Sequence, residues 1–199
     1  FAVLLAICVY SYFALTNEFF ATHRTGYAIM ERFAVLGLVG LALTLCIIAG
    51  EIDLSIGSNA ALAAVIVVRF TDSLGAVTAL LIAILISTLV GAIQGYFIAY
   101  LRVRAIVLTV GTLMLLRGVA LFAAQEKTVM LTDFRVPDFI STKMFLYFSP
   151  ASLLVIAMFI VVGLFMTFTR YGREIYAIGG ARKEAIAAGI DLKRPMIIV

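Results

Sequence analysis

The most regular feature of the chain is the alternation of long apolar stretches with short charged segments. A transmembrane helix needs about 20 mostly apolar residues, and a charge near the bilayer centre is costly. Five stretches carry no charge, and a sixth contains Arg117 as its only charged residue: residues 1–17, 33–50, 54–68, 73–101 and 144–169, and residues 105–124. The pattern predicts an all-α, polytopic transmembrane helical bundle with about six spans.

The third stretch is short and directly follows Glu51 and Asp53. We therefore expect a broken or re-entrant helix near residues 50–58. In one interpretation Asp53 or Ser55 caps the next helix by accepting hydrogen bonds from its first N–H groups. In the other, the break lines a buried or water-filled pathway, as the discontinuous helices of transporters do. Both interpretations can hold together.

The glycines beside this break, Gly50 and Gly57, predict close approach of neighbouring helices. The candidate residues of the break or pathway in this part of the chain are Glu51, Asp53, Ser55, Gly57 and Ser58.

A second group of candidate break or pathway residues lies in the stretch 105–124: Thr109, Gly111, Thr112 and Arg117. Thr109 and Thr112 are three residues apart and share a helix face, with Gly111 between them. Thr109 can bond back to its own helix, which would make it structural. For Arg117 we expect a function or an ion pair, with Glu51 and Asp53 as possible partners.

Charge asymmetry predicts the orientation in the membrane. Residues 170–194 contain six basic and three acidic residues, and Arg102 and Arg104 follow another span. Two spans separate these positive segments, so both lie on the same, cytoplasmic side. The balanced segment 125–143 is then expected outside.

The segment 170–194 is predicted to be ordered. Gly179 and Gly180 indicate a turn, and a short helix is expected from residue 182 to 188, closed by Gly189. By its physics alone this helix could lie on lipid headgroups or dock into a partner.

Composition narrows the function classes. Hydrophobic residues make up 64% of the 199 residues, charged residues make up 13%, and the mean hydropathy is +1.18. A net charge of +4 without a basic run does not favour a nucleic-acid partner. The cysteines Cys8 and Cys46 lie in apolar stretches and His23 is the only histidine, so no metal site is expected. Because the chain begins and ends within apolar sequence, we expect it to be a fragment.

Three motifs in register resemble the permease subunits of bacterial ABC importers for ribose, xylose and related monosaccharides, in the branched-chain amino acid and sugar-type permease family. They are the residues at 50–58, those at 108–112 with 116–118, and those at 171–180 with 183–185 and 189–190. The resemblance covers essentially the whole chain. In one departure, many members have a glycine where this chain has Glu51.

The resemblance implies a single transmembrane permease domain over residues 1–199, in the bacterial plasma (inner) membrane. Its implied partners are membrane lipid, a cytoplasmic ABC ATPase, a periplasmic or lipid-anchored solute-binding protein, and a second permease subunit. The permease itself would bind no cofactor or metal and would be no enzyme. ATP would bind to the ATPase, and this chain has no phosphate-binding loop of the G-x-x-x-x-G-K-[ST] type.

The resemblance also assigns the loop at 170–194 to ATPase coupling, which favours the docking interpretation of its short helix. The implied coupling residues are Gly172, Arg173, Gly179, Gly180, Glu184, Ala185 and Gly189.

Two other functions are compatible with the pattern. A secondary transporter would also use discontinuous helices and an intramembrane Arg117, but no convincing internal repeat is present. A membrane enzyme centred on Glu51, Asp53 and Arg117 would lack a nucleophile-base pair or a metal cluster. The sequence therefore favours an ATP-driven importer of a monosaccharide or similar small polar solute.

Overall fold

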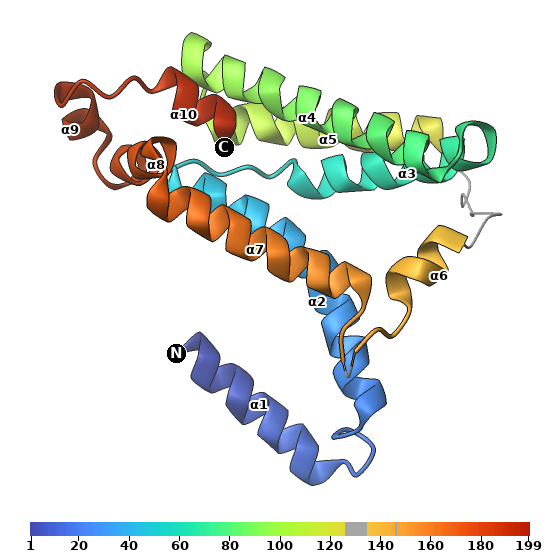
Figure 1. The fold of residues 1–199 in the computed structure, drawn as a ribbon. Coiled ribbons are helices and arrows are strands. Elements are labelled where there is room, and N and C mark those ends of the chain that lie inside the picture. Colours follow the sequence, from blue (N-terminus) through green and yellow to red (C-terminus); the bar gives the residue numbers. More distant parts are fainter. Residues whose placement is uncertain (126–134, 146) are drawn as a thin grey trace. The chain divides into compact units, whose positions relative to one another are not determined.

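The structure is a computed structural model that describes residues 1–125, 135–145 and 147–199. Part of the predicted external segment 125–143 thus lies outside the described residues. The helices in the described part are α1 (Ala2–Thr16), α2 (His23–Ile48), α3 (Ile56–Leu74), α4 (Ala76–Leu101), α5 (Ala105–Ala123), α6 (Arg135–Ser141), α7 (Pro150–Phe168), α8 (Arg170–Gly180), α9 (Arg182–Ala187) and α10 (Lys193–Ile198). The expected all-α architecture is confirmed, as Figure 1 shows.

Each of the six predicted spans forms a helix, but the helices differ in length and polarity. Among the described residues, α2, α4, α5 and α7 are long and apolar enough to cross a membrane. The helix α1 has only 15 residues, and α3 carries Arg69 and Asp72 near its end. Four of the six predicted spans therefore meet the length and hydropathy expected of a membrane-crossing helix, while α1 is shorter and α3 is the short helix expected after the break.

The chain divides into two compact units, Phe1–Leu38 with Pro137–Met158, and Val39–Val136 with Phe159–Val199. In the first unit, α7 begins at a pair of buried serines. The backbone N–H of Ser149 donates to Ser152 Oγ at 2.9 Å, and that of Ser152 donates to Ser149 Oγ at 3.2 Å. With Pro150 at the first helical position, this reciprocal capping fixes where α7 starts.

In the second unit, α3 packs along α4 and α5 (Figure 1). Its core consists of apolar side chains from all three helices: Leu62 and Ile66 of α3, Ala83 of α4, and Leu116 and Ala120 of α5. The small Ala83 and Ala120 let the helix backbones approach closely, which is how helices associate where lipid removes the hydrophobic drive.

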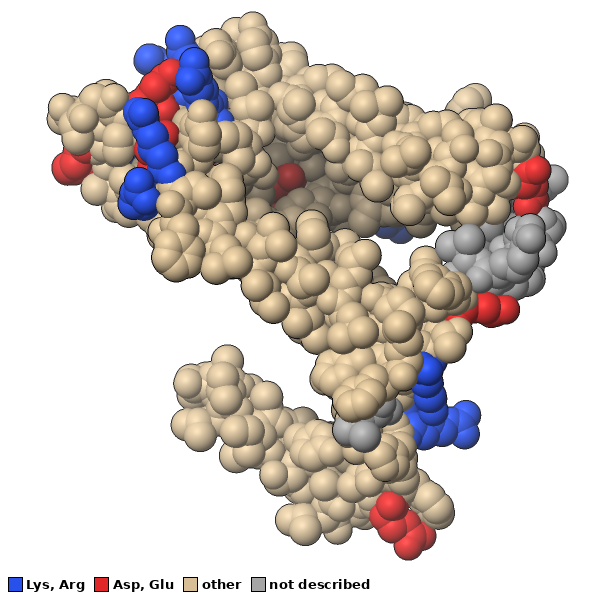
Figure 2. Space-filling view, viewed as in Figure 1, with Lys and Arg blue, Asp and Glu red and all other residues tan. Residues whose placement is uncertain are grey.

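Most large apolar side chains of α4 point outward, for example Leu81 with 61% of its surface exposed. On the face shown in Figure 2, charged side chains gather at the end of the second unit formed by α8, α9 and α10. An apolar flank with charges at one end is typical of a helix bundle whose sides face lipid or another protein.

Candidate functional site

The predicted break is a non-helical segment, residues 49–55, between the end of α2 and the start of α3. Gly50 turns the chain with φ +78, a conformation that favours glycine. The segment then runs to Ser55, the N-cap of α3. Gly57 and Ser58, which the sequence placed in the break, already belong to the first turn of α3.

Asp53 and Ser55 organise the end of the break. One carboxylate oxygen, Asp53 Oδ1, accepts hydrogen bonds from both the backbone N–H and the hydroxyl of Ser55, each at 2.7 Å. Ser55 makes no side-chain cap of its own. Of the two possible capping residues, Asp53 therefore satisfies an N–H group at the helix start.

Buried polar side chains of α4 and α5 hold the break against these helices. Gln94 of α4, 8% exposed, donates from Nε2 to Ser55 Oγ at 2.9 Å. Thr109 of α5 is 1% exposed, and its hydroxyl reaches the Ile52 carbonyl at 3.4 Å and its own helix at Ile106 at 3.5 Å. Polar side chains of two helices, α4 and α5, therefore contact the non-helical segment, and Gln94 and Thr109 line a cavity of about 70 Å³ beside it.

The other predicted residues on α3 and α5 lie apart from this network. Thr112 donates to the Leu108 carbonyl of its own helix at 3.0 Å. A methyl group added to Gly57 or Gly111 would meet no atom of the described residues within 4 Å, so neither glycine serves a close helix contact in that part of the chain. Ser58 is buried in α3.

Arg117 does not form the ion pair considered from the sequence. Its side chain is exposed on α5, and no partner for it is present among residues 1–125, 135–145 and 147–199. Glu51 pairs with Arg182 and Asp53 bonds to Ser55 instead. The two acidic residues lie in the break and Arg117 lies on α5, and spacing along the chain could not show which charges meet.

The segment after α7 is ordered, and more helical than expected. Thr169 caps α8, accepting from the Gly172 N–H at 3.1 Å. Gly179 and Gly180 form the last turn of α8 rather than a loop, and the reversal follows at Ala181. The predicted short helix is α9, followed by Gly189 with φ +82.

Two of the predicted coupling glycines lie against other backbone. A methyl group on Gly172 would overlap the Met166 carbonyl oxygen, and one on Gly179 would overlap that of Ile48. Gly180 has open space around it. Arg173 donates to the Phe168 carbonyl at 3.3 Å, which ties the start of α8 to the end of α7.

The short helix α9 has one buried and one exposed side. Ala185 is 5% exposed and packs with Ile178 of α8 and Met196 of α10. Glu184 and Ile186 are exposed, Ile186 at 52%. Because buried Ala185 anchors α9 to its neighbours, the exposed side chains of Glu184 and Ile186 can contact another macromolecule while α9 stays folded.

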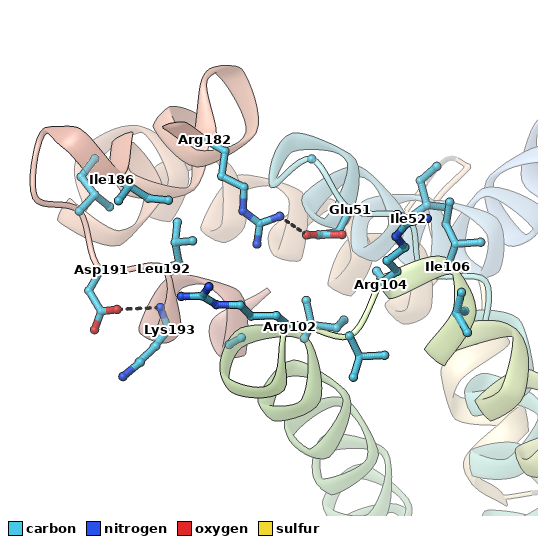
Figure 3. A pocket seen from close by; sticks show the side chains of 17 residues that line it. Glu51, Ile52, Arg102, Arg104, Ile106, Arg182, Ile186, Asp191, Leu192 and Lys193 are labelled. Carbon is cyan, nitrogen blue, oxygen red and sulfur yellow. Dashed lines mark hydrogen bonds and ion pairs between the residues drawn. The ribbon is translucent and has the colours of Figure 1, made fainter. Parts of the chain in front are cut away.

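One ion pair joins the break to α9. Arg182 Nη1, at the first residue of α9, lies 2.7 Å from Glu51 Oε1. The pair lines a cavity of about 800 Å³, whose other lining residues include the basic Arg102, Arg104 and Lys193 and the apolar Ile52 and Ile106 (Figure 3). The cavity is therefore both basic and apolar.

Sequence reasoning missed Gln94 and Arg182 as site residues. Gln94 had a signal, because it is the one amide side chain in the stretch 73–101 and lies within the G-x-x-x-G sequence at 91–95. That motif indicated helix packing, and Gly95 does face α10, where an added methyl group would lie 3.0 Å from Ile197 Cα. For Arg182, nothing in the local sequence indicates a partner 131 positions away.

These features define a multi-pass helical membrane protein with a broken helix and an ordered segment that contacts the break. Residues 27–199 match the family described as the branched-chain amino acid transport system permease component, and the chain belongs to that family. The expected family resemblance is thereby confirmed.

Individual relatives agree with this assignment. The chain is 31% identical to the L-arabinose transport system permease protein of Escherichia coli strain K12 over 100% of its own length and 59% of the relative's. It is 28% identical to the D-allose transport system permease protein of that strain (98% and 60%) and 27% identical to an inner membrane ABC transporter permease protein (98% and 61%). The chain thus spans about three fifths of the length of these curated relatives. No solved structure matches it.

Proposed function

We propose that the chain is part of the transmembrane subunit of an ATP-driven importer that passes a monosaccharide or similar small polar solute across the bacterial inner membrane. The observation that carries this proposal is the family match together with relatives named as sugar permeases and, in one case, as an ABC transporter permease. These names do not favour a secondary transporter. Ribose and xylose stay predictions.

In an importer of this kind, three further proteins act together with the permease. A cytoplasmic ABC ATPase binds and hydrolyses ATP, a periplasmic or lipid-anchored binding protein delivers the solute, and a second permease subunit completes the pathway. The segment 170–194 faces the cytoplasm, where its basic residues satisfy the positive-inside rule. The permease alternates access by movement of packed helices around the break.

In this proposal α9 is the surface that docks on the ATPase. Its exposed Glu184 is available for contact, while the buried Ala185 anchors the helix to α8 and α10. Gly189, with φ +82, lets the chain reverse immediately after α9. In this proposal α9 acts through α8, because Gly179 near the end of α8 lies against the backbone of Ile48 and Ala49, where the break begins.

The test is co-purification of the detergent-solubilised full-length protein with candidate ATPases from its own genome. We expect one ATPase to bind the wild type and to be lost from a variant lacking residues 181–189. Glu184→Arg and Gly189→Pro should also weaken binding while leaving membrane insertion intact. Glu18→Arg is the matched control, because it makes the same charge change at an exposed site between α1 and α2.

Two outcomes would contradict the proposal. If the intact protein binds no ATPase, the secondary-transporter alternative is favoured and α9 becomes a lipid-surface helix. If Glu184→Arg and Gly189→Pro bind the ATPase as the wild type does, docking does not take place through α9.

A further inference from the structure

The non-helical break and the segment leading to α9 meet through backbone as well as through side chains. Gly179 lies against the Ile48 carbonyl, and a methyl group on Gly50 would lie 3.3 Å from Gly179 Cα. Next to this contact, Ala49 of the break and Ile175 of α8 are buried in one cluster with Met166. The C-terminal end of α8 therefore cannot move far without displacing the start of the break.

The ion pair between Glu51 and Arg182 extends this contact across the chain reversal to α9. Glu51 directly follows Gly50, and Arg182 opens α9, so the pair joins the first carboxylate of the break to the first residue of the short helix. The Glu51 side chain is only 20% exposed, and that of Arg182 is 44% exposed. Partial burial of the carboxylate reduces solvent screening of the pair.

The other charges around Glu51 are basic or already engaged. Arg102, Arg104 and Lys193 line the same cavity, and Asp191 accepts a hydrogen bond from the Lys193 backbone N–H at 3.1 Å. Within the described residues, Arg182 is the only ion-pair partner of Glu51. Loss of Arg182 would therefore leave Glu51 without its direct contact.

We propose that Glu51 and Arg182 are positioning residues that transmit displacement of α9 to the non-helical break. This inference rests on the proposed function, in which the ATPase moves α9. Movement enters the break most easily, because residues 50–54 make none of the i to i−4 backbone hydrogen bonds that stiffen a helix. Ile52 follows Glu51 directly, and its carbonyl contacts Thr109, so a shift at Glu51 reaches α5.

The effect of losing the pair is expected to be partial, because the Gly179 contact with Ile48 persists without it. Partly exposed ion pairs stabilise one arrangement over another by factors of about 1.4 to 5. We expect the ATP-dependent change at the break to fall about threefold when either charge is removed.

The experiment uses the full-length protein assembled with its ATPase in proteoliposomes and needs no transported solute. In a Cys8→Ser background, Ile52→Cys reports on the break, because the Ile52 side chain is 45% exposed. The rate of maleimide labelling is measured with and without ATP and vanadate, after subtraction of labelling in the parent that retains buried Cys46. The variants are Glu51→Gln, Arg182→Gln and the charge swap Glu51→Arg with Arg182→Glu.

We expect both single variants to retain the bound ATPase and to show an ATP-dependent change about threefold smaller than that of the wild type, and the charge swap to restore it. The control is Glu174→Gln, which breaks the 2.7 Å pair with Arg170 inside α8. That pair, in which the Glu174 carboxylate raises the pKa of Arg170, does not reach the break, so the control should behave as the wild type.

Single variants with an unchanged ATP-dependent response would overturn the inference, as would a charge swap that restores nothing. Failure of the proposed function looks different, because then the wild-type protein binds no ATPase at all.

Discussion

Gly179 and Gly180 are adjacent in the last turn of α8, but only Gly179 lies against another backbone segment. A methyl group on Gly179 would overlap the Ile48 carbonyl oxygen and lie 2.8 Å from its carbon and 3.1 Å from the Ala49 carbonyl carbon. A methyl group on Gly180 would meet nothing within 4 Å. The substitutions Gly179→Ala and Gly180→Ala therefore add the same methyl group, in the first case against backbone and in the second case in open space.

The expected magnitude follows from two terms. Replacing a helical glycine by alanine stabilises a helix by up to about 1 kcal/mol, and this gain is similar at both positions. Inserting a methyl group where backbone must shift costs about 1 to 3 kcal/mol. Because the helix term cancels in the comparison, Gly179→Ala should have a free energy of unfolding about 1 to 3 kcal/mol lower than Gly180→Ala.

The assay is reversible unfolding of the purified full-length variants in mixed detergent micelles, followed by circular dichroism of the helices. ATPase co-purification of each variant is measured in parallel. We expect Gly179→Ala to be the less stable variant and to bind the ATPase less well, because its α8 is displaced from the break. Equal stability of the two variants would refute the close contact between Gly179 and Ile48, and with it the direct link between α8 and the break.

Two further predictions concern the polar network around the break. Ser55→Ala removes the acceptor of the buried Gln94 amide and should lower the free energy of unfolding by about 1 to 3 kcal/mol, whereas exposed Ser73→Ala should leave it nearly unchanged. Thr109→Val keeps the side-chain shape but loses the hydroxyl contact to the break, so a loss of about 1 kcal/mol is expected. Thr112→Val, whose hydroxyl bonds its own helix, should change the same quantity by less than about 0.5 kcal/mol. Denaturant titration checks both pairs, and equal effects within a pair would contradict the assigned contacts.

The sequence by itself determined where the long apolar helices form and where the break between α2 and α3 lies. Long uncharged stretches predict the helices because burying backbone away from water requires internal hydrogen bonding, a local property of each stretch. The glycine, carboxylates and serine between Gly50 and Ser55 predict the interruption, because their side chains can satisfy backbone groups that a helix would otherwise satisfy. The helix-forming residues after Ala181, followed by Gly189, predict α9.

Which side chains meet was decided only by the tertiary structure. Ser55 and Gln94 are 39 positions apart, and Glu51 and Arg182 are 131 apart. Their contacts depend on how helices pack and rotate about their axes, and local composition does not fix that rotation. Because the sequence does not fix this rotation, it identified Glu51 as a candidate residue but suggested the wrong ion-pair partner, Arg117. The packing of α8 against the break instead brought Arg182 to it.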